Sequence, residues 1–68
     1  MKKTEGDFGR EYAEWGQAQE GFDSPVDIDK ILGQTVSIPD GDYTKMVSAG
    51  IENPNARDYW EGFNSFFE

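Results

Sequence analysis

The chain has 68 residues and a formal net charge of -8, and it contains neither cysteine nor histidine. A domain of this size is marginally stable, and without cysteine it has no disulfide framework and no thiolate for metal binding or catalysis. Without histidine it also lacks the commonest general base and the commonest metal ligand, so we expect no enzyme, no metal site and no cofactor.

Hydropathy and charge limit the cellular compartments and the classes of binding partner that the sequence allows. No apolar run approaches the roughly 20 residues that span a bilayer, and the stretch MKKTEGDFGREY lacks the apolar segment of a signal peptide. We therefore expect a cytoplasmic protein without membrane contact. The negative charge repels phosphates, so direct nucleic-acid binding is not expected, whereas basic protein surfaces are attracted. The alternative is that the acidic surface serves only solubility.

The first predicted element is a helix that begins at Asp7, after a frayed end at residues 1–6. Asp7 suits the cap or the first turn, and Gly21 is expected to stop the helix. Gly16 is expected to allow a close helix crossing. The aromatic side chains that recur near one face are Phe8, Tyr12, Trp15 and Phe22.

A second, short helix is predicted within DSPVDIDKILGQ. Ser24 suits the N-cap and Pro25 the first helical position, while Asp27 lies three residues after the cap. Gly33 is expected to close this helix. A calcium loop starting at Asp27 fails as an alternative, because Ile31 takes the third ligand position and no glutamate closes the loop.

The middle segment, QTVSIPDGDYTKMVSAGI, fits two structures. Val36 and Ile38 alternate with polar residues, and IPDG is a good turn, which together indicate a short β-hairpin around residues 35–47. We prefer an extended TVSI followed by a helix over residues 40–49, because Tyr43, Met46 and Val47 share the spacing of one helix face.

The ends of that third helix can also be predicted. Asp40 or Asp42 would cap its start. Gly50 followed by Ile51 resembles a helical C-terminal motif with its hydrophobic contact.

The final helix has the strongest pattern. Asn53 is the candidate N-cap, and Pro54 takes the first helical position. Tyr59 and Phe66 widen an apolar face whose main members are Ala56, Trp60, Phe63 and Phe67.

These elements predict a mainly α fold, a small single-domain bundle of three to four short helices over residues 7–68. Aliphatic side chains are few, so the aromatic face of the last helix must pack on the Phe8, Tyr12 and Trp15 face of the first. The rings exceed what one helix face can bury, and exposed aromatic side chains are common binding anchors. The candidate anchors are Trp15, Tyr43, Tyr59 and Phe66.

Acidic residues dominate the first half of the chain, with no lysine or arginine between Glu11 and Asp29. If the first two helices share a face, these carboxylates form a continuous negative strip that imitates the phosphates of a nucleic-acid strand. The alternative is an ordinary solvated face. The acidic residues expected to bind a partner are Glu11, Glu14, Glu20, Asp23, Asp27, Asp29, Asp40 and Asp42.

Two stretches, EWGQAQEG and AGIENPNARDYWEGF, carry a family resemblance. The chain resembles the ribosome modulation factor family of small bacterial and phage proteins. The resemblance implies a two-helix ribosome-binding protein that silences translation, although that family is basic and this chain is acidic. In size and charge the chain also resembles phage-encoded inhibitors such as anti-CRISPR and anti-restriction proteins. The residues that carry the family resemblance are Ala49, Gly50, Asn53, Pro54, Arg57, Trp60, Gly62 and Phe63.

The sequence thus supports three functional hypotheses. The first is a non-enzymatic inhibitor or adaptor, encoded by a phage or mobile element, that binds a basic surface of a nucleic-acid-processing protein or complex. The second is a ribosome-associated factor that works through Arg57 and Trp60. The third is a structural subunit that forms a homodimer through its C-terminal aromatic helix.

Overall fold

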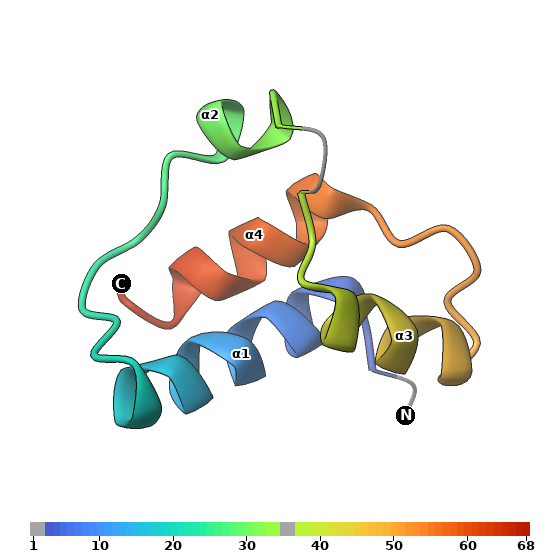
Figure 1. Cartoon of the computed structure of the whole chain (residues 1–68), viewed down its shortest axis with the longest axis horizontal. Helices are drawn as coiled ribbons and strands as arrows, with labels where there is room; N and C mark the ends of the chain where they lie inside the picture. Colours follow the sequence, from blue (N-terminus) through green and yellow to red (C-terminus); the bar gives the residue numbers. More distant parts are fainter. Residues whose placement is uncertain (1–2, 35–36) are drawn as a thin grey trace.

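The computed structural model describes residues 3–34 and 37–68, and within them the chain is all-α (Figure 1). These residues contain no strand, so the mainly α prediction is confirmed and the hairpin alternative is wrong over residues 37–47. Residues 1–2 of the predicted frayed end, and residues 35–36 of the predicted extended segment and hairpin, lie outside the described residues. The helices are α1 (Glu5–Gln19), α2 (Ile28–Leu32), α3 (Asp40–Ser48) and α4 (Ala56–Ser65).

Helix α1 begins at Glu5, earlier than the predicted start at Asp7, because Thr4 caps it. The Thr4 hydroxyl accepts a hydrogen bond from the Asp7 N–H (3.3 Å), and the Asp7 carboxylate accepts one from the Thr4 N–H (2.9 Å). This reciprocal capping box satisfies N–H groups that have no partner within the helix. The helix ends at Gln19, and Gly21 adopts a φ of +75°, as expected of a stop residue.

Helices α1 and α4 lie side by side and form the main helix pair (Figure 1). Glycines bring their backbones into direct contact. A Cβ atom at Gly9 would lie 1.9 Å from the carbonyl oxygen of Tyr59, and one at Gly62 would lie 2.0 Å from the carbonyl oxygen of Gly6. No other residue type fits these positions without moving a helix, so the crossing depends on glycine.

Gly16 does not lie at this crossing, contrary to the prediction. The Phe22 ring, which follows the end of α1, folds back over Gly16, where a Cβ atom would lie 2.0 Å from the ring. From there Phe22 meets Tyr12 edge-on, with ring centroids 5.6 Å apart, and Phe63 at 5.8 Å. The small residue therefore makes room for a core ring and not for a second helix.

The core is largely aromatic and lies where α1, α3 and α4 meet. As predicted, the aromatic face of α4 packs on the Phe8 and Tyr12 face of α1, with Tyr12 and Phe63 centroids 5.9 Å apart. Trp15, the third member of the predicted α1 face, is 51% exposed and lies outside the core. The buried side chains are Phe8, Ala13, Ile38, Met46, Tyr59, Trp60 and Phe63.

Helix α2 is shorter than predicted, because the preceding segment is held extended against α4. The Asn64 side chain accepts a hydrogen bond from the Val26 N–H (2.9 Å) and donates one to the Val26 carbonyl (3.1 Å). With both backbone groups engaged, Val26 cannot join a helix. Ser24 is therefore not the N-cap, and Asp27 caps a helix that begins at Ile28. The predicted end at Gly33 is confirmed.

Helix α3 confirms the predicted C-terminal motif but not the predicted cap. Gly50 has a φ of +98°, its N–H bonds to the Val47 carbonyl (3.0 Å), and the Ile51 N–H bonds to the Met46 carbonyl (2.9 Å). This pair of bonds defines a Schellman motif. At the other end Pro39 is the N-cap and makes no side-chain capping bond.

Helix α4 begins after Asn55, and the predicted cap at Asn53 is wrong. The Asn55 side chain accepts a hydrogen bond from the Asp58 N–H (3.1 Å), while its own N–H donates to the Glu5 carboxylate (3.3 Å). The second bond ties the start of α4 to the start of α1. Pro54 accordingly precedes the helix instead of opening it.

Candidate functional site

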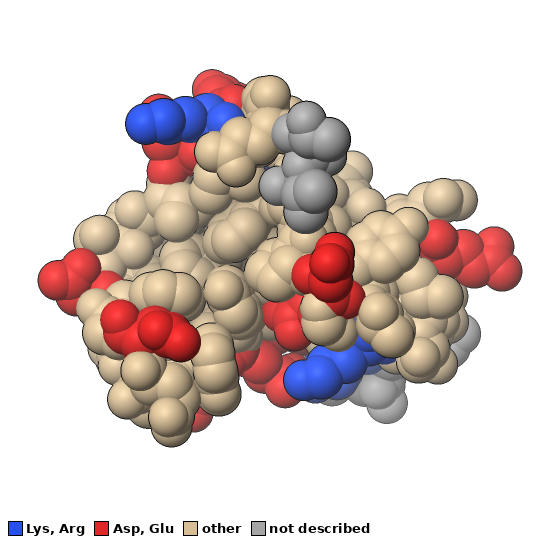
Figure 2. Space-filling model, in the orientation of Figure 1, with Lys and Arg blue, Asp and Glu red and all other residues tan. Residues whose placement is uncertain are grey.

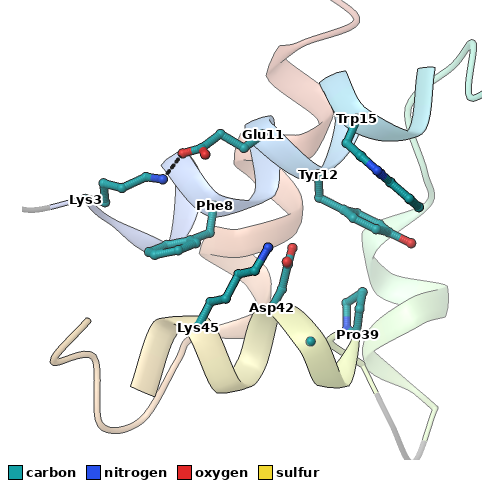
Figure 3. Close-up of a pocket in the computed structure, with 9 residues that line it drawn as sticks. Lys3, Phe8, Glu11, Tyr12, Trp15, Pro39, Asp42 and Lys45 are labelled. Carbon is teal, nitrogen blue, oxygen red and sulfur yellow. Dashed lines mark ion pairs between the residues drawn. The ribbon is translucent and has the colours of Figure 1, made fainter. Parts of the chain in front are cut away.

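A cleft of about 480 Å³ opens between α1 and α3 (Figure 3). It combines aromatic walls with charges of both signs, which distinguishes it from the apolar core beneath. Residues from both helices and from the segments before them line it: Lys3, Phe8, Glu11, Tyr12, Trp15, Pro39, Gly41, Asp42 and Lys45.

The α1 wall follows from helical spacing. Phe8, Glu11, Tyr12 and Trp15 lie three or four residues apart, so one face of α1 presents all of them to the cleft. The Tyr12 and Trp15 rings stack, with centroids 5.8 Å apart and planes 17° from parallel. Tyr12 is half-buried and contacts the core, whereas Trp15 is exposed. The Tyr12 ring, held by the core, therefore supports the exposed Trp15 ring.

The α3 wall is fixed to the core through Asp42. Its carboxylate accepts a 2.5 Å hydrogen bond from the hydroxyl of Tyr59, a fully buried residue of α4. Burial raises the pKa of the Tyr59 hydroxyl far above its ordinary value, and the hydrogen bond and charge of Asp42 raise it further. Tyr59 therefore stays a neutral donor that holds Asp42 in place at the cleft.

The two ends of the cleft differ in charge (Figure 3). At one end Lys3 forms an ion pair with Glu11, and its ammonium lies 4.5 Å from the centroid of the Phe8 ring. Lys45 points into the cleft near this end and has no ion-pair partner among the described residues. Tyr12 and Trp15 form the other end, with Asp42 between the two.

Carboxylates control the field around Tyr12. Burial raises the pKa of the Tyr12 hydroxyl, and the charges of Asp42 and Glu20 raise it further. The hydroxyl therefore lies in a negative field, and the aromatic end of the cleft favours a cation over an anion.

The predicted acidic residues do not form one strip, because α1 and α2 share no face. Each packs on α4 and they do not touch one another (Figure 1). Glu11, Glu14 and Glu20 therefore belong to one side of α4, and Asp27 and Asp29 to the other. Figure 2 shows acidic side chains in separate groups around a hollowed, uncharged centre.

The remaining predicted acids divide in the same way. Asp23 lies in the segment between α1 and α2, whereas Asp40 and Asp42 lie in the first turn of α3. Of these three, only Asp42 lines the cleft, where Tyr59 fixes its side chain, while Asp23 and Asp40 are exposed.

The predicted aromatic anchors separate into exposed and buried rings. Trp15 is 51% exposed and Tyr43 46% exposed, as an anchor requires. Phe66 is partly buried against the core. The prediction for Tyr59 is wrong, because its side chain is fully buried beneath α3 and its hydroxyl is taken by Asp42.

The residues expected to act in a ribosome-binding factor have structural partners here. Trp60 is buried, and its indole N–H donates to the Ser37 carbonyl. Arg57 is exposed and lies 3.1 Å from the Asp29 carboxylate in an ion pair that joins α4 to α2. The aromatic face of α4 that would form a homodimer is covered by α1 within the same chain. The ribosomal and dimeric hypotheses remain predictions.

Sequence reasoning missed several residues of the cleft. The sequence patterns place Tyr12 and Phe8 in the core and predict no binding role for Lys3, Pro39, Gly41 or Lys45. The three-residue spacing of Tyr12 and Trp15 was the available signal, since it places two rings on one side of a helix. The approach of α3 to that side could not be inferred from spacing.

Comparison of the chain with known protein families, with curated proteins and with solved structures found no match. Over residues 3–34 and 37–68, no helix is long and apolar enough to cross a membrane. The same residues contain no group of three or more acidic side chains placed to hold a metal ion.

Proposed function

We propose that this protein is a non-enzymatic inhibitor or adaptor that binds a basic surface of a nucleic-acid-processing protein or complex. The observation that carries the proposal is the exposed Trp15 ring, stacked on Tyr12 at the mouth of the α1–α3 cleft in a chain of net charge -8. An exposed, supported aromatic side chain is a frequent energetic centre of protein interfaces.

Charge and aromatic contact have separate roles in such an interface. The net negative charge accelerates encounter with a basic partner and weakens encounter with acidic ones, an effect that salt screens. Trp15 then contributes buried area once the partner is in place. For binding by this route, salt should lower the association rate, and loss of the Trp15 ring should shorten the lifetime of the complex.

A purely solubilising role for the acids does not account for Trp15. Solubility favours charged surfaces without exposed large rings, yet this chain leaves Trp15 half-exposed beside Glu11 and Glu14. The two roles make different predictions, since a solubilising surface has no preferred partner.

An affinity pull-down from bacterial lysate at low and high salt tests the proposal. We expect the wild-type chain to retain a basic nucleic-acid-processing protein that salt releases, and we expect Trp15→Ala to lose most of it. Tyr43→Ala removes the other exposed candidate anchor, which lies outside the cleft, and should cost less binding than Trp15→Ala because the proposed contact is at the cleft. Retention that ignores both salt and Trp15→Ala would contradict the proposal.

Charge reversal then shows which side of α4 faces the partner. One variant combines Glu14→Lys with Glu20→Lys, in α1 and at its C-terminal end, and the other combines Asp27→Lys with Asp29→Lys at α2. Both pairs change the net charge equally, and the α2 pair also removes the Asp27 cap and the Asp29–Arg57 ion pair. A larger loss in the α1 pair therefore reports position and neither total charge nor damage to α2. We expect the larger loss at α1.

A further inference from the structure

A hollow of about 290 Å³ lies between α4 and the segment that joins α1 to α2, which runs past the C-terminal end of α4 (Figure 1). Asp23 is the only charged side chain among the described residues that line it. Its volume is at the lower end of small-molecule sites, so it suits one large side chain better than a whole ligand. The apolar side chains that line the hollow are those of Tyr12, Phe22, Val26, Trp60 and Phe63.

The walls of the hollow are fixed by contacts within the chain. Phe22 folds back over Gly16, and its N–H bonds to the Gly16 carbonyl (3.2 Å). Val26 is held by the Asn64 side chain, which bonds to both of its backbone groups. The hollow therefore exists before a partner arrives, and binding there loses no free energy to the ordering of these walls.

The hollow adjoins the α1–α3 cleft, because Tyr12 lines both. The Tyr12 ring contacts the Trp15 ring, with centroids 5.8 Å apart, and the Phe22 ring, with centroids 5.6 Å apart. These three rings form a contiguous aromatic surface that leads from the exposed Trp15 to the hollow. A partner that contacts Trp15 can therefore extend into the hollow across Tyr12.

We propose that the hollow receives a large apolar side chain of the partner, flanked on the partner surface by lysine or arginine. The inference rests on the proposed function, because the flanking residues belong to the basic surface that it assumes. The apolar walls require the first part, since burial of apolar area is the main favourable contribution that such a hollow offers.

Carboxylates at and near the hollow select the flanking residues. Asp23 lines the hollow and is exposed. The charges of Asp42 and Glu20 act on the Tyr12 hydroxyl, whose pKa they raise after burial has done so. Basic residues beside the apolar side chain therefore meet opposite charges. A second copy of this chain would instead bring its own net charge of -8 to the same place, so charge opposes that occupant.

The test is a titration of the full chain, carrying ¹³C-labelled valine and methionine methyl groups, with the peptide acetyl-Arg-Arg-Leu-Arg-Arg-amide. One matched peptide has alanine in place of leucine, and another has glutamate in place of all the arginines. The Val26 methyl signals report the hollow. Val47, which is exposed on α3 outside the hollow, reports non-specific contact, and the fully buried Met46 reports the fold.

We expect the leucine peptide to shift the Val26 signals saturably at millimolar concentration and to leave Val47 unmoved. The alanine peptide should bind at least about fivefold more weakly, and the glutamate peptide should not bind. Asp23→Asn should weaken binding of the leucine peptide about twofold to fivefold. Asp40→Asn, an equal change of charge in α3 outside the hollow, should weaken it less.

Four results would each overturn the inference: no shift at Val26, equal shifts at Val26 and Val47, equal affinity for the leucine peptide and either matched peptide, or equal losses in Asp23→Asn and Asp40→Asn. Val26 shifts on concentration of the chain alone would also overturn it, because a second copy would then fill the hollow. An unchanged Met46 signal in each variant shows that the fold persists.

The pull-down separates this inference from the proposed function. If a basic protein is retained by binding that depends on salt and Trp15, but the leucine peptide leaves Val26 unmoved, the hollow is not a binding site and the proposed function stands. If the peptide binds in the hollow but no basic protein is retained, the proposed function fails and the binding site stands.

Discussion

The Tyr59 hydroxyl donates a 2.5 Å hydrogen bond to the Asp42 carboxylate, and this contact joins the core helix α4 to the cleft wall on α3. Tyr59 is fully buried, whereas Asp42 is only partly buried. The aromatic residues at the end of the chain therefore serve the core first. One of them also fixes the Asp42 side chain in the wall of the cleft.

Tyr59→Phe should keep the fold and lower the free energy of unfolding by about 1 kcal/mol, since it removes one hydrogen bond to a partly hydrated carboxylate. Urea denaturation at neutral pH measures this cost. Unchanged stability would show that this hydrogen bond contributes nothing to the fold.

The same residue predicts how stability depends on alkaline pH. Burial, followed by the hydrogen bond and charge of Asp42, raises the pKa of Tyr59 in the folded chain. The unfolded chain releases this proton near the ordinary tyrosine pKa of about 10. The contribution of Tyr59 to the free energy of unfolding is thus complete below pH about 10. Above that pH it falls by about 1.4 kcal/mol per pH unit. Urea denaturation of wild type and Tyr59→Phe from pH 8 to about 11 should show curves that converge above pH about 10; parallel curves would contradict the raised pKa.

The glycine crossing gives a prediction about stability alone. Gly9→Ala places a Cβ atom against the Tyr59 carbonyl, which belongs to rigid backbone, and should cost about 1–3 kcal/mol. Gly41→Ala lies in a helix with nothing within 4 Å of the added atom and should gain about 0.5–1 kcal/mol. A loss of stability in Gly9→Ala together with a gain in Gly41→Ala, measured by urea denaturation, would confirm the crossing. Equal changes in the two variants would show that α1 lies farther from α4.

Patterns along the chain predicted what depends on local chemistry. The all-α class, the packing of α1 on α4 and the C-terminal motif at Gly50 and Ile51 all follow from spacing and from one glycine. The helix starts were harder, because neighbouring residues compete for the cap. Asn53 and Asn55 are equally good caps, and the contact between Asn55 and Glu5, distant in sequence, accompanies the observed choice.

The candidate site depended on relationships that the sequence does not carry. Which rings of α4 are buried depends on how that helix is rotated against α1, so Tyr59 could not be told from Phe66. The continuous acidic strip required α1 and α2 to be neighbours, yet α4 lies between them. Trp15 was predicted both as part of the packing face of α1 and as a candidate anchor; the structure exposes it, and its cleft required the position of α3.

Asn64 should hold the segment before α2 in place. Its side chain makes both hydrogen bonds to the Val26 backbone, so Asn64→Ala should cost about 1–3 kcal/mol. Hydrogen exchange of the Val26 amide should accelerate more than exchange within the α1–α4 crossing. Asn53→Ala removes an exposed amide with no side-chain hydrogen bond in the described residues and should change stability by less than about 0.5 kcal/mol. Equal exchange in both variants would show that the segment is held by packing alone.

The electrostatic field at Trp15 can be measured without a partner. In a Trp60→Phe variant the remaining tryptophan fluorescence comes from Trp15, which is exposed beside Glu11 and Glu14. Caesium should quench it more than iodide, each compared with its quenching of free N-acetyl-tryptophanamide, because the local field concentrates cations. Added salt should reduce the difference, and Glu14→Lys with Glu20→Lys should reverse or abolish it. Equal relative quenching by the two ions at low salt would mean that Trp15 lies in a neutral field, and that steering by charge does not act at this cleft.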